Sequence, residues 1–303
     1  MTNFRPIGII LALLTGSLWG CSVPLGKILA QSGTNMLTVV FLRSLVVCVV
    51  VALWILLFNG VRGVRFKMAQ LPFLISVGIM NIIFTAVGFL LSLKYLSVPV
   101  ALLIHYLFPI ATIAGEFFIF HQPLSRRKII AALLVLWGLW VGMLQSGATK
   151  DITISAVGIL WGLLAVIGLA GQSLMGKIAA QRHYDYKVVL LYSHIFGTAL
   201  LGLIKFFAFG MNDVFFLSCN EVYIIVAIGM LGGVLAYAAY YISLKYISSS
   251  LASLLCTSEI IVGMLAASVI LFTPPSGFEI LGAGIIIFAI SISVIPSREK
   301  ADL

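Results

Sequence analysis

Long apolar stretches separated by short polar segments run through the whole 303-residue chain. Ten of them reach the length of about 20 mostly apolar residues that a helix needs to cross a bilayer. They cover residues 7–30, 36–58, 70–94, 97–120, 128–146, 153–180, 187–209, 220–245, 248–271 and 278–295. The pattern predicts an all-α membrane protein with ten transmembrane helices.

Two of these stretches are copies of each other. Residues 91–120 and 242–271 align at an offset of 151 and share nine of thirty residues, five of them in the pattern Ser-Leu-Lys-Tyr-x-Ser. The same offset pairs Arg43 with His194. We therefore expect two five-helix repeats, residues 1–150 and 151–303. An odd number of spans in each copy turns the second copy upside down, so the repeats are expected to be inverted.

Charge and composition set the membrane orientation. Hydrophobic residues make up 62% of the chain and charged residues 9%, against about 25% charged in soluble domains. With the N-terminus inside, 13 of the 18 Lys and Arg residues fall in segments on the cytoplasmic side. The positive-inside rule then predicts a multi-pass protein of the cell membrane with both termini cytoplasmic and the 148–154 loop outside. This distribution accounts for the net charge of +9 without a nucleic-acid partner.

Several classes of chemistry lack their motifs. The chain contains no Walker motif, H-E-x-x-H or G-x-S-x-G, which disfavours an ATP-driven pump or a hydrolase. Its four cysteines have no C-x-x-C spacing, so we expect no metal site and no disulfide. The expectation is a protein without cofactor and without enzyme activity.

The fourth span carries a polar stripe. His105, Pro109, Thr112 and Glu116 follow steps of four, three and four, which places them on one helical face. Carboxyl and imidazole groups avoid lipid, so this face is expected to point inward. His105 and Glu116 are candidates for coupling transport to protons. For Glu116, an ion pair with Arg126 or Arg127 at the cytoplasmic end is the alternative.

Glu259 lies near the middle of the ninth span, about 16 Å from its cytoplasmic end at 1.5 Å per residue. A carboxyl group at that depth is protonated, forms an ion pair or is hydrated in a water-filled cavity. We expect Glu259 to take up a proton or to bind a substrate amine. The alternative is a protonated side chain that is hydrogen-bonded to Ser or Tyr.

Other polar and aromatic residues within spans complete the candidate cavity. Gln172 and Ser173 lie mid-span beside glycines, and three tyrosines of the eighth span follow the i, i+3, i+4 spacing of one helical face. Arg43 in the second span is expected to snorkel or to cap a helix end. The candidate substrate-binding residues are Trp19, His105, Tyr106, Gln172, Ser173, Tyr237, Tyr240, Tyr241, Cys256 and Glu259.

The order of these features resembles a known family. Two five-helix halves, Trp19 before Gly20 in the first span, Arg43 early in the second, the repeated Lys-Tyr-x-Ser pattern and Pro109 in the fourth are similar to the EamA-type transporters of the drug/metabolite transporter superfamily. The resemblance implies a carrier of a small metabolite or drug. It also implies a central cavity lined mainly by spans 1, 3, 4, 6, 8 and 9.

The chain departs from that family pattern at two places. Many relatives carry Gly-Glu where this chain has His121-Gln122, and a proline in span 9 where it has Ile260. The substrate and the coupling mechanism of those relatives are therefore not assigned to this chain.

A secondary transporter working by alternating access is the expected function. Aromatic cavity residues with few fixed charges favour a small amphipathic substrate, such as an amino acid or amine, and disfavour phosphorylated anions. The expected mode is export or exchange, by a monomer or weak dimer in the lipid bilayer, with protons as candidate coupling ion. A channel or structural membrane subunit is the alternative, and an intramembrane enzyme is a further one.

Overall fold

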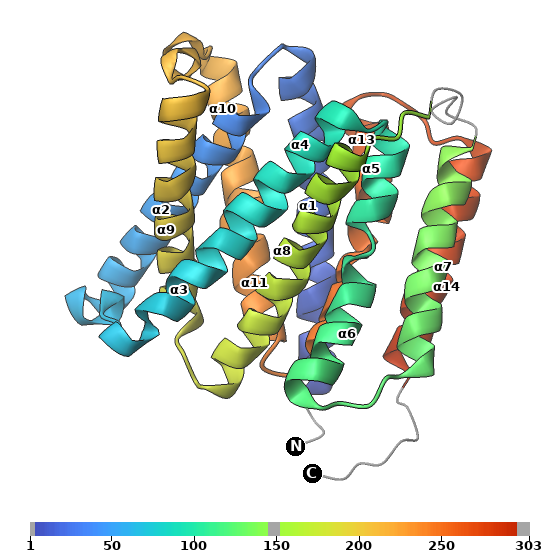
Figure 1. Cartoon of the computed structure of the whole chain (residues 1–303), viewed down its shortest axis with the longest axis horizontal. Helices are drawn as coiled ribbons and strands as arrows, with labels where there is room; N and C mark the ends of the chain where they lie inside the picture. The colour runs from blue at the N-terminus through green and yellow to red at the C-terminus, as the bar shows by residue number, and fades with distance from the viewer. Residues whose placement is uncertain (1–3, 145–151, 296–303) are drawn as a thin grey trace.

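The computed structural model describes residues 4–144 and 152–295 (Figure 1). Its α-helices in the first half are α1 (Arg5–Gln31), α2 (Met36–Asn59), α3 (Leu71–Gly78), α4 (Gly88–Tyr95), α5 (Val98–His105), α6 (Phe108–Phe120) and α7 (Arg126–Met143). Those of the second half are α8 (Ala156–Gln181), α9 (Tyr186–Ala208), α10 (Cys219–Ile228), α11 (Ala236–Ser243), α12 (Ser249–Cys256), α13 (Ser258–Ile270) and α14 (Gly277–Val294). Short 3-10 turns lie at η1 (Val61–Val64), η2 (Met68–Gln70) and η4 (Asn212–Phe216).

The helices repeat in order from the first half to the second. In each half the third span contains a π-helical segment, η3 (Ile79–Val87) in the first and η5 (Gly229–Leu235) in the second. Figure 1 shows α1 and α8, the first helix of each half, running in opposite directions along the bundle. The fold is therefore two inverted five-helix repeats. The predicted boundary between residues 150 and 151 lies outside the described residues and stays a prediction.

Ten long helical stretches lie in the described residues. Nine helical stretches of the described residues are long and apolar enough to cross a membrane. The tenth is α7, an 18-residue helix that begins with Arg126, Arg127 and Lys128. These three cations suit the polar interface at a helix end, because long basic side chains reach the headgroup region. The prediction of ten transmembrane helices is confirmed.

The start of the first helix, α1, and the end of the last helix, α14, meet at the same end of the bundle. Arg5 in the first turn of α1 donates a hydrogen bond of 2.8 Å from Nη2 to the carbonyl oxygen of Val294 at the end of α14. We call this the Arg5 end and the other the opposite end. In Figure 1 the Arg5 end is at the bottom, where α6 also ends.

The fourth and ninth spans are both broken near their middle. In the fourth, α5 stops at His105 and α6 starts at Phe108, with Pro109 in its first turn, where a missing N–H is tolerated. In the ninth, the break at Thr257 has no proline, and the Thr257 amide and hydroxyl both donate to the Leu254 carbonyl, at 3.2 and 2.6 Å. The break in the fourth span divides its polar face, which the sequence predicts on one continuous helix. His105 lies before the first break and Glu116 after it.

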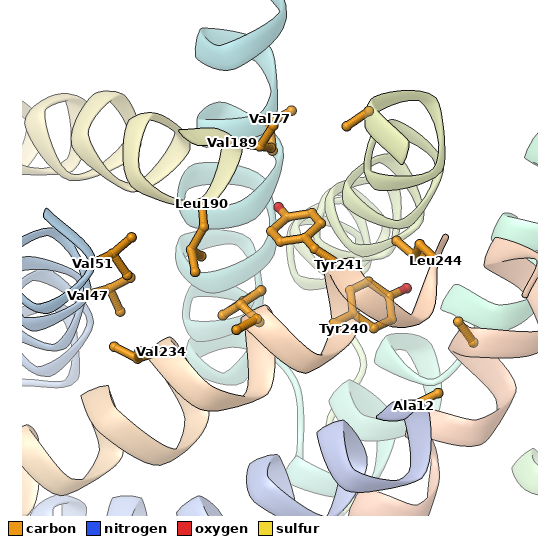
Figure 2. Close-up of a cluster of buried hydrophobic side chains, with 14 of the residues drawn as sticks. Ala12, Val47, Val51, Val77, Val189, Leu190, Val234, Tyr240, Tyr241 and Leu244 are labelled. Atoms are coloured by element: carbon orange, nitrogen blue, oxygen red, sulfur yellow. The ribbon is translucent and has the colours of Figure 1, made fainter. Parts of the chain in front are cut away.

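The centre of the bundle is packed with tyrosines and branched aliphatic residues. Tyr240 and Tyr241 of α11 are each 2% exposed. Figure 2 shows them between the helices, in the same cluster as Val47 and Val51 of α2 and Leu190 of α9. This cluster joins helices of both halves, so it fixes how the two repeats sit against each other.

Glycines allow α7 and α14 to touch backbone to backbone. A Cβ atom at Gly282 would lie 2.3 Å from the Gly138 carbonyl oxygen, whereas one at Gly284, two residues along, would meet no atom within 4 Å. We expect Gly282→Ala to destabilise the protein by about 1 to 3 kcal/mol, the usual cost of overpacking. Gly284→Ala is the matched control and should be neutral or slightly stabilising, since Ala is the better helix former. Thermal unfolding in one detergent compares them, and equal melting temperatures would contradict the close packing.

Candidate functional site

A cavity of about 320 Å³ lies between the two halves. Its walls come from α1, α2, η3, α4, α5, α6, α8, α10, η5, α11 and α13. Small-molecule sites usually measure about 300 to 1,000 Å³, so this one suits a small metabolite. Spans 1, 3, 4, 6, 8 and 9 contribute to it, as the family resemblance implies, and span 2 contributes as well.

The cavity extends from the middle of the bundle toward the opposite end. Trp19 and Glu259 line its inner part, at mid-span in α1 and at the start of α13. Gly26 near the end of α1, Met36 at the start of α2 and Leu90 on α4 line its outer part. The space is therefore on the side of the bundle away from Arg5.

Aromatic groups form the floor of the cavity. The Trp19 indole donates a 2.9 Å hydrogen bond from Nε1 to the carbonyl oxygen of Gly232 in η5. Its ring meets that of Tyr237 edge-on at a centroid distance of 5.5 Å. The Tyr237 hydroxyl in turn donates to Oδ1 of Asn81 in η3 at 2.7 Å. These contacts join three spans directly below the cavity, and both partner residues sit in π-helical segments, which often mark functional sites.

Four of the ten predicted binding residues line this cavity: Trp19, His105, Tyr237 and Glu259. Nδ1 of His105 is buried and has no hydrogen-bond partner among the described residues.

The other six predicted residues lie outside the cavity wall. Tyr240 donates its hydroxyl to Ser173 at 2.6 Å, and the Cys256 thiol lies 3.6 Å from the carbonyl oxygen of Ala12. Tyr106, Gln172 and Tyr241 are buried. The sequence pattern identifies these six as inward-facing, but it does not distinguish packing between helices from exposure to a cavity.

Arg43 is a charged wall residue that the predicted set lacks. From the sequence, Arg43 is expected to snorkel or to cap a helix end; in the structure it lines the central cavity. Its position in α2, about 10 Å from that helix's start, is compatible with both arrangements. In the structure α2 packs against η5 and α9.

Glu259 sits in the first turn of α13, a half-helix that begins inside the span. The free N–H groups of a helix N-terminus carry partial positive charge, which favours a carboxylate there. Within residues 4–144 and 152–295, no hydrogen bond or ion pair of 4.0 Å or less reaches the side chains of Glu259 or Arg43. The cavity wall therefore carries an arginine and a glutamate whose side chains do not pair with each other.

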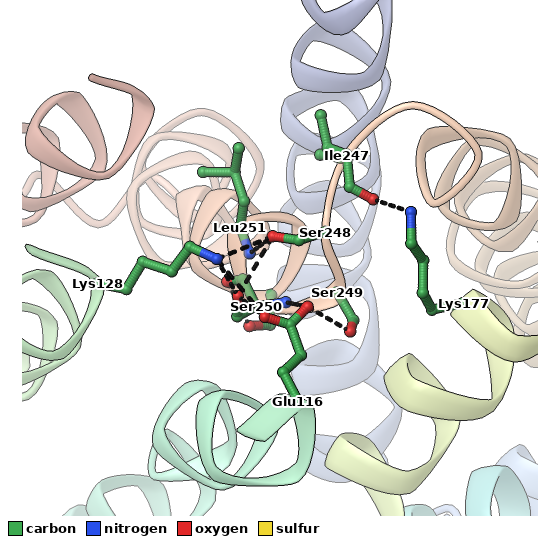
Figure 3. Close-up of polar contacts among 9 residues, drawn as sticks. Glu116, Lys128, Lys177, Ile247, Ser248, Ser249, Ser250 and Leu251 are labelled. Atoms are coloured by element: carbon green, nitrogen blue, oxygen red, sulfur yellow. Dashed lines mark hydrogen bonds and ion pairs between the residues drawn. The ribbon is translucent and has the colours of Figure 1, made fainter. Parts of the chain in front are cut away.

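A polar network closes the Arg5 end (Figure 3). Glu116 of α6 is 4% exposed and accepts hydrogen bonds from the Ser249 hydroxyl at 2.8 Å, the Ser250 amide at 2.9 Å and the Ser250 hydroxyl. Lys128 of α7 lies 3.5 Å from the carboxylate and donates to the Ser248 and Ser250 hydroxyls at 3.0 and 2.6 Å. We call Glu116, Lys128, Ser248, Ser249 and Ser250 the Glu116 network. It ties the first half to the N-terminus of α12 in the second.

A second lysine strengthens this closure. Lys177 of α8 donates to the carbonyl oxygens of Leu244 and Ile247 at 2.9 and 2.8 Å, just before α12 (Figure 3). The predicted partners of Glu116 were Arg126 or Arg127, whereas the structure gives it the next cation, Lys128, together with the serines. Hydropathy and spacing carry no information on the serine contacts, because these join residues more than 130 positions apart.

The comparisons identify the family. The family model described as "EamA-like transporter family" matches twice, at residues 6–144 and 156–295. The chain belongs to this family. Its EamA resemblance is thereby confirmed, and the two matches fall on the two repeats.

Relatives support the same fold. An uncharacterized transporter, YxxF, of Bacillus subtilis (strain 168) is 22% identical over 223 residues, covering 73% of this chain and 70% of its own length. A crystal structure of another protein matches with a TM-score of 0.78 at 18% identity, over 95% of this chain and 96% of that one. The EamA-like chain is therefore a multi-pass membrane protein of a transporter family.

Proposed function

We propose that this EamA-like protein is a secondary transporter that moves a small amphipathic metabolite, an amino acid, amine or related compound, across the cell membrane by alternating access. The main support is the cavity, which extends toward one end of the bundle while the Glu116 network closes the other. A carrier needs a site that is reached from one side at a time, between two repeats that exchange roles. A channel would instead open at both ends at once, and a structural subunit needs no such cavity.

The two repeats are unequal at the closing contacts. The offset of 151 residues pairs Glu116 with Ala267 and Lys128 with Glu279. When the halves exchange roles, the opposite end would therefore close without a carboxylate and lysine pair. We propose that, without substrate, the conformation closed at the Arg5 end is the more populated one.

The Arg5 end is proposed to be cytoplasmic, because the loops at that end carry most of the cations. In a chain with its native cysteines replaced, Arg65→Cys should resist an impermeant maleimide in intact cells and react after permeabilisation. Phe215→Cys, exposed in η4 between α9 and α10, should react in intact cells. The reverse pattern would overturn the orientation.

The substrate class is proposed from the chemistry of the wall. Trp19 and Tyr237 offer aromatic faces to apolar groups and cations. No cluster of Lys or Arg surrounds the cavity in the described residues, which disfavours phosphorylated metabolites. A thermal-shift screen of the purified protein against amino acids, amines, nucleobases and sugar phosphates tests this, because a ligand that binds the folded state raises the melting temperature. Stabilisation by a sugar phosphate alone would reject the proposed class.

The energy source is proposed to be a gradient of substrate or protons. Of the three coupling candidates, Glu259 and His105 line the cavity and Glu116 is held in the closing network. We propose export or exchange by a monomer or weak dimer, without enzyme activity. Counterflow in proteoliposomes measures exchange directly, with the compound that gives the largest thermal shift as the probe.

A further inference from the structure

A pocket apart from the central cavity lies at the Arg5 end, where the turn between α8 and α9 is seen at the bottom of Figure 1. It measures about 480 Å³, which is within the range of small-molecule sites. The end of α8, the turn into α9, the first residues of α9 and the segment after α11 form its wall. None of its residues lines the central cavity, so this pocket is separate from the site proposed for transport.

Two lysines line this pocket, Lys187 in the first turn of α9 and Lys245 after the end of α11. Nζ of Lys245 lies 5.1 Å from the centroid of the Tyr186 ring, and this cation–π contact holds the ammonium group at the wall. Within residues 4–144 and 152–295, no carboxylate oxygen lies within 4.0 Å of Nζ of Lys245. The wall therefore carries a lysine charge without a counter-ion from the protein.

The acidic residue of the wall, Asp185, already has partners. Its Oδ1 accepts a hydrogen bond of 2.9 Å from the Lys187 amide and caps α9, and its Oδ2 lies 3.9 Å from the Lys187 ammonium group. Lys187 also donates from Nζ to Oδ1 of Asn59, the last residue of α2, at 2.6 Å. One carboxylate against two ammonium groups leaves the wall with a net positive charge. An anion is the ligand that this wall suits.

The surface beside the pocket is apolar. Lys187 contacts the end of α2, and the Trp54 ring of α2 meets the Tyr186 ring of the pocket at a centroid distance of 6.4 Å. On the same last turns of α2, Leu57 and Phe58 are each 77% exposed. Trp and Tyr are enriched at the level of lipid headgroups. The pocket thus combines cations at a span end with an apolar face that suits acyl chains.

We propose that this pocket binds the phosphate group of an anionic phospholipid, with Lys187 and Lys245 at the headgroup and the acyl chains along α2. Basic pockets between spans on the cytoplasmic side are known places for such headgroups. Tyr184 and Tyr186 line the same wall, and a phenol hydroxyl is a further hydrogen-bond donor to phosphate. The bound headgroup bridges the start of α9 and the segment after α11.

Four soluble probes separate the charge of the headgroup from the acyl chains: short-chain phosphatidylglycerol, short-chain phosphatidylcholine, glycerol 3-phosphate and inorganic phosphate. In a non-ionic detergent, phosphatidylglycerol should raise the melting temperature of the wild-type protein saturably, and the other three should have a much smaller effect. Lys187→Gln and Lys245→Gln should each weaken the apparent affinity for phosphatidylglycerol about fivefold, the usual effect of one lysine near anionic lipid. The response to phosphatidylcholine should not change.

Two further variants serve as controls. Lys94→Gln removes the lysine that the offset of 151 residues pairs with Lys245, and its Nζ lies 5.7 Å from the Tyr95 ring centroid at the opposite end. This variant should bind phosphatidylglycerol as wild type does. Asp185→Asn removes the negative charge of the wall and keeps a good N-cap. It should bind phosphatidylglycerol more tightly, a gain that damage to the fold would not produce.

Several results would overturn this site. Equal stabilisation by phosphatidylglycerol and phosphatidylcholine would do so, as would an unchanged affinity in both lysine variants or an equal loss in Lys94→Gln. Stabilisation by inorganic phosphate or glycerol 3-phosphate as strong as that by phosphatidylglycerol would assign the pocket to a free phosphate compound and overturn the lipid assignment. Because the wall shares no residue with the central cavity, each of these results leaves the proposed transport function standing.

Discussion

Replacing Glu116 with alanine is expected to destabilise the conformation closed at the Arg5 end by about 3 to 5 kcal/mol, the usual cost of breaking a buried ion pair from one side. The change removes three hydrogen bonds to Ser249 and Ser250 and leaves Lys128 without its carboxylate. The protein should then spend more time open at that end. A lower melting temperature and faster maleimide labelling of Ile247→Cys, which is buried at that end, would report the two effects.

A double variant separates loss of closure from general unfolding. Glu116→Leu with Lys128→Met replaces the pair by apolar side chains, which is often neutral or stabilising in buried sites. It should restore the melting temperature. If the Glu116→Ala variant has the same melting temperature as wild type and its cysteine is labelled no faster, the Glu116 network does not hold this end closed.

Replacing Glu259 with glutamine is expected to weaken binding of the transported amine or amino acid about ten- to a hundredfold. Glutamine keeps the size and hydrogen bonding of the side chain and removes its charge and its titration. The charge is placed to act on a ligand, because Glu259 lines the cavity in the first turn of α13 and no protein group pairs with it in the described residues. Binding by calorimetry and counterflow in proteoliposomes measure the loss.

The matched control for this change is Glu279→Gln. Glu279 also lies in the first turn of a helix, α14, where it accepts a hydrogen bond from the Ser276 amide at 2.7 Å, but it is outside the cavity. Its variant should bind and exchange substrate as wild type does. If Glu259→Gln folds and keeps the affinity and pH dependence of wild type, Glu259 has only a structural role.

The spans and the repeat could be predicted because both follow from local or periodic properties of the sequence. Apolar length sets the span limits, and the 151-residue offset recovers the order of the helices in both halves. The depth of Glu259 also follows from its place along a span. These properties are independent of how the helices turn against one another.

The orientation of individual side chains is a property of packing and could not be predicted. Arg43 lines the cavity because of how α2 rotates against its neighbours, and its own stretch of sequence is equally compatible with a snorkelling side chain. The break at Thr257 lies in a span without proline, so the sequence carries no local signal for it. Tyr240 and Ser173 meet across two helices, so a polar pair that resembles a binding site is part of the packing.

Alternating access is tested most directly by two distances measured in the same protein. In a background without native cysteines, one pair of spin labels at positions 122 and 245 reports the Arg5 end, and a second pair at 31 and 94 reports the opposite end. All four positions are exposed, and none belongs to the cavity wall or the Glu116 network. Double electron–electron resonance should give two populations for each pair. Glu116→Ala should lengthen the 122–245 distance and shorten the 31–94 distance together. A single distribution for each pair, unchanged by Glu116→Ala, or a variant in which both ends open at once, would contradict a carrier that exposes its cavity to one side at a time.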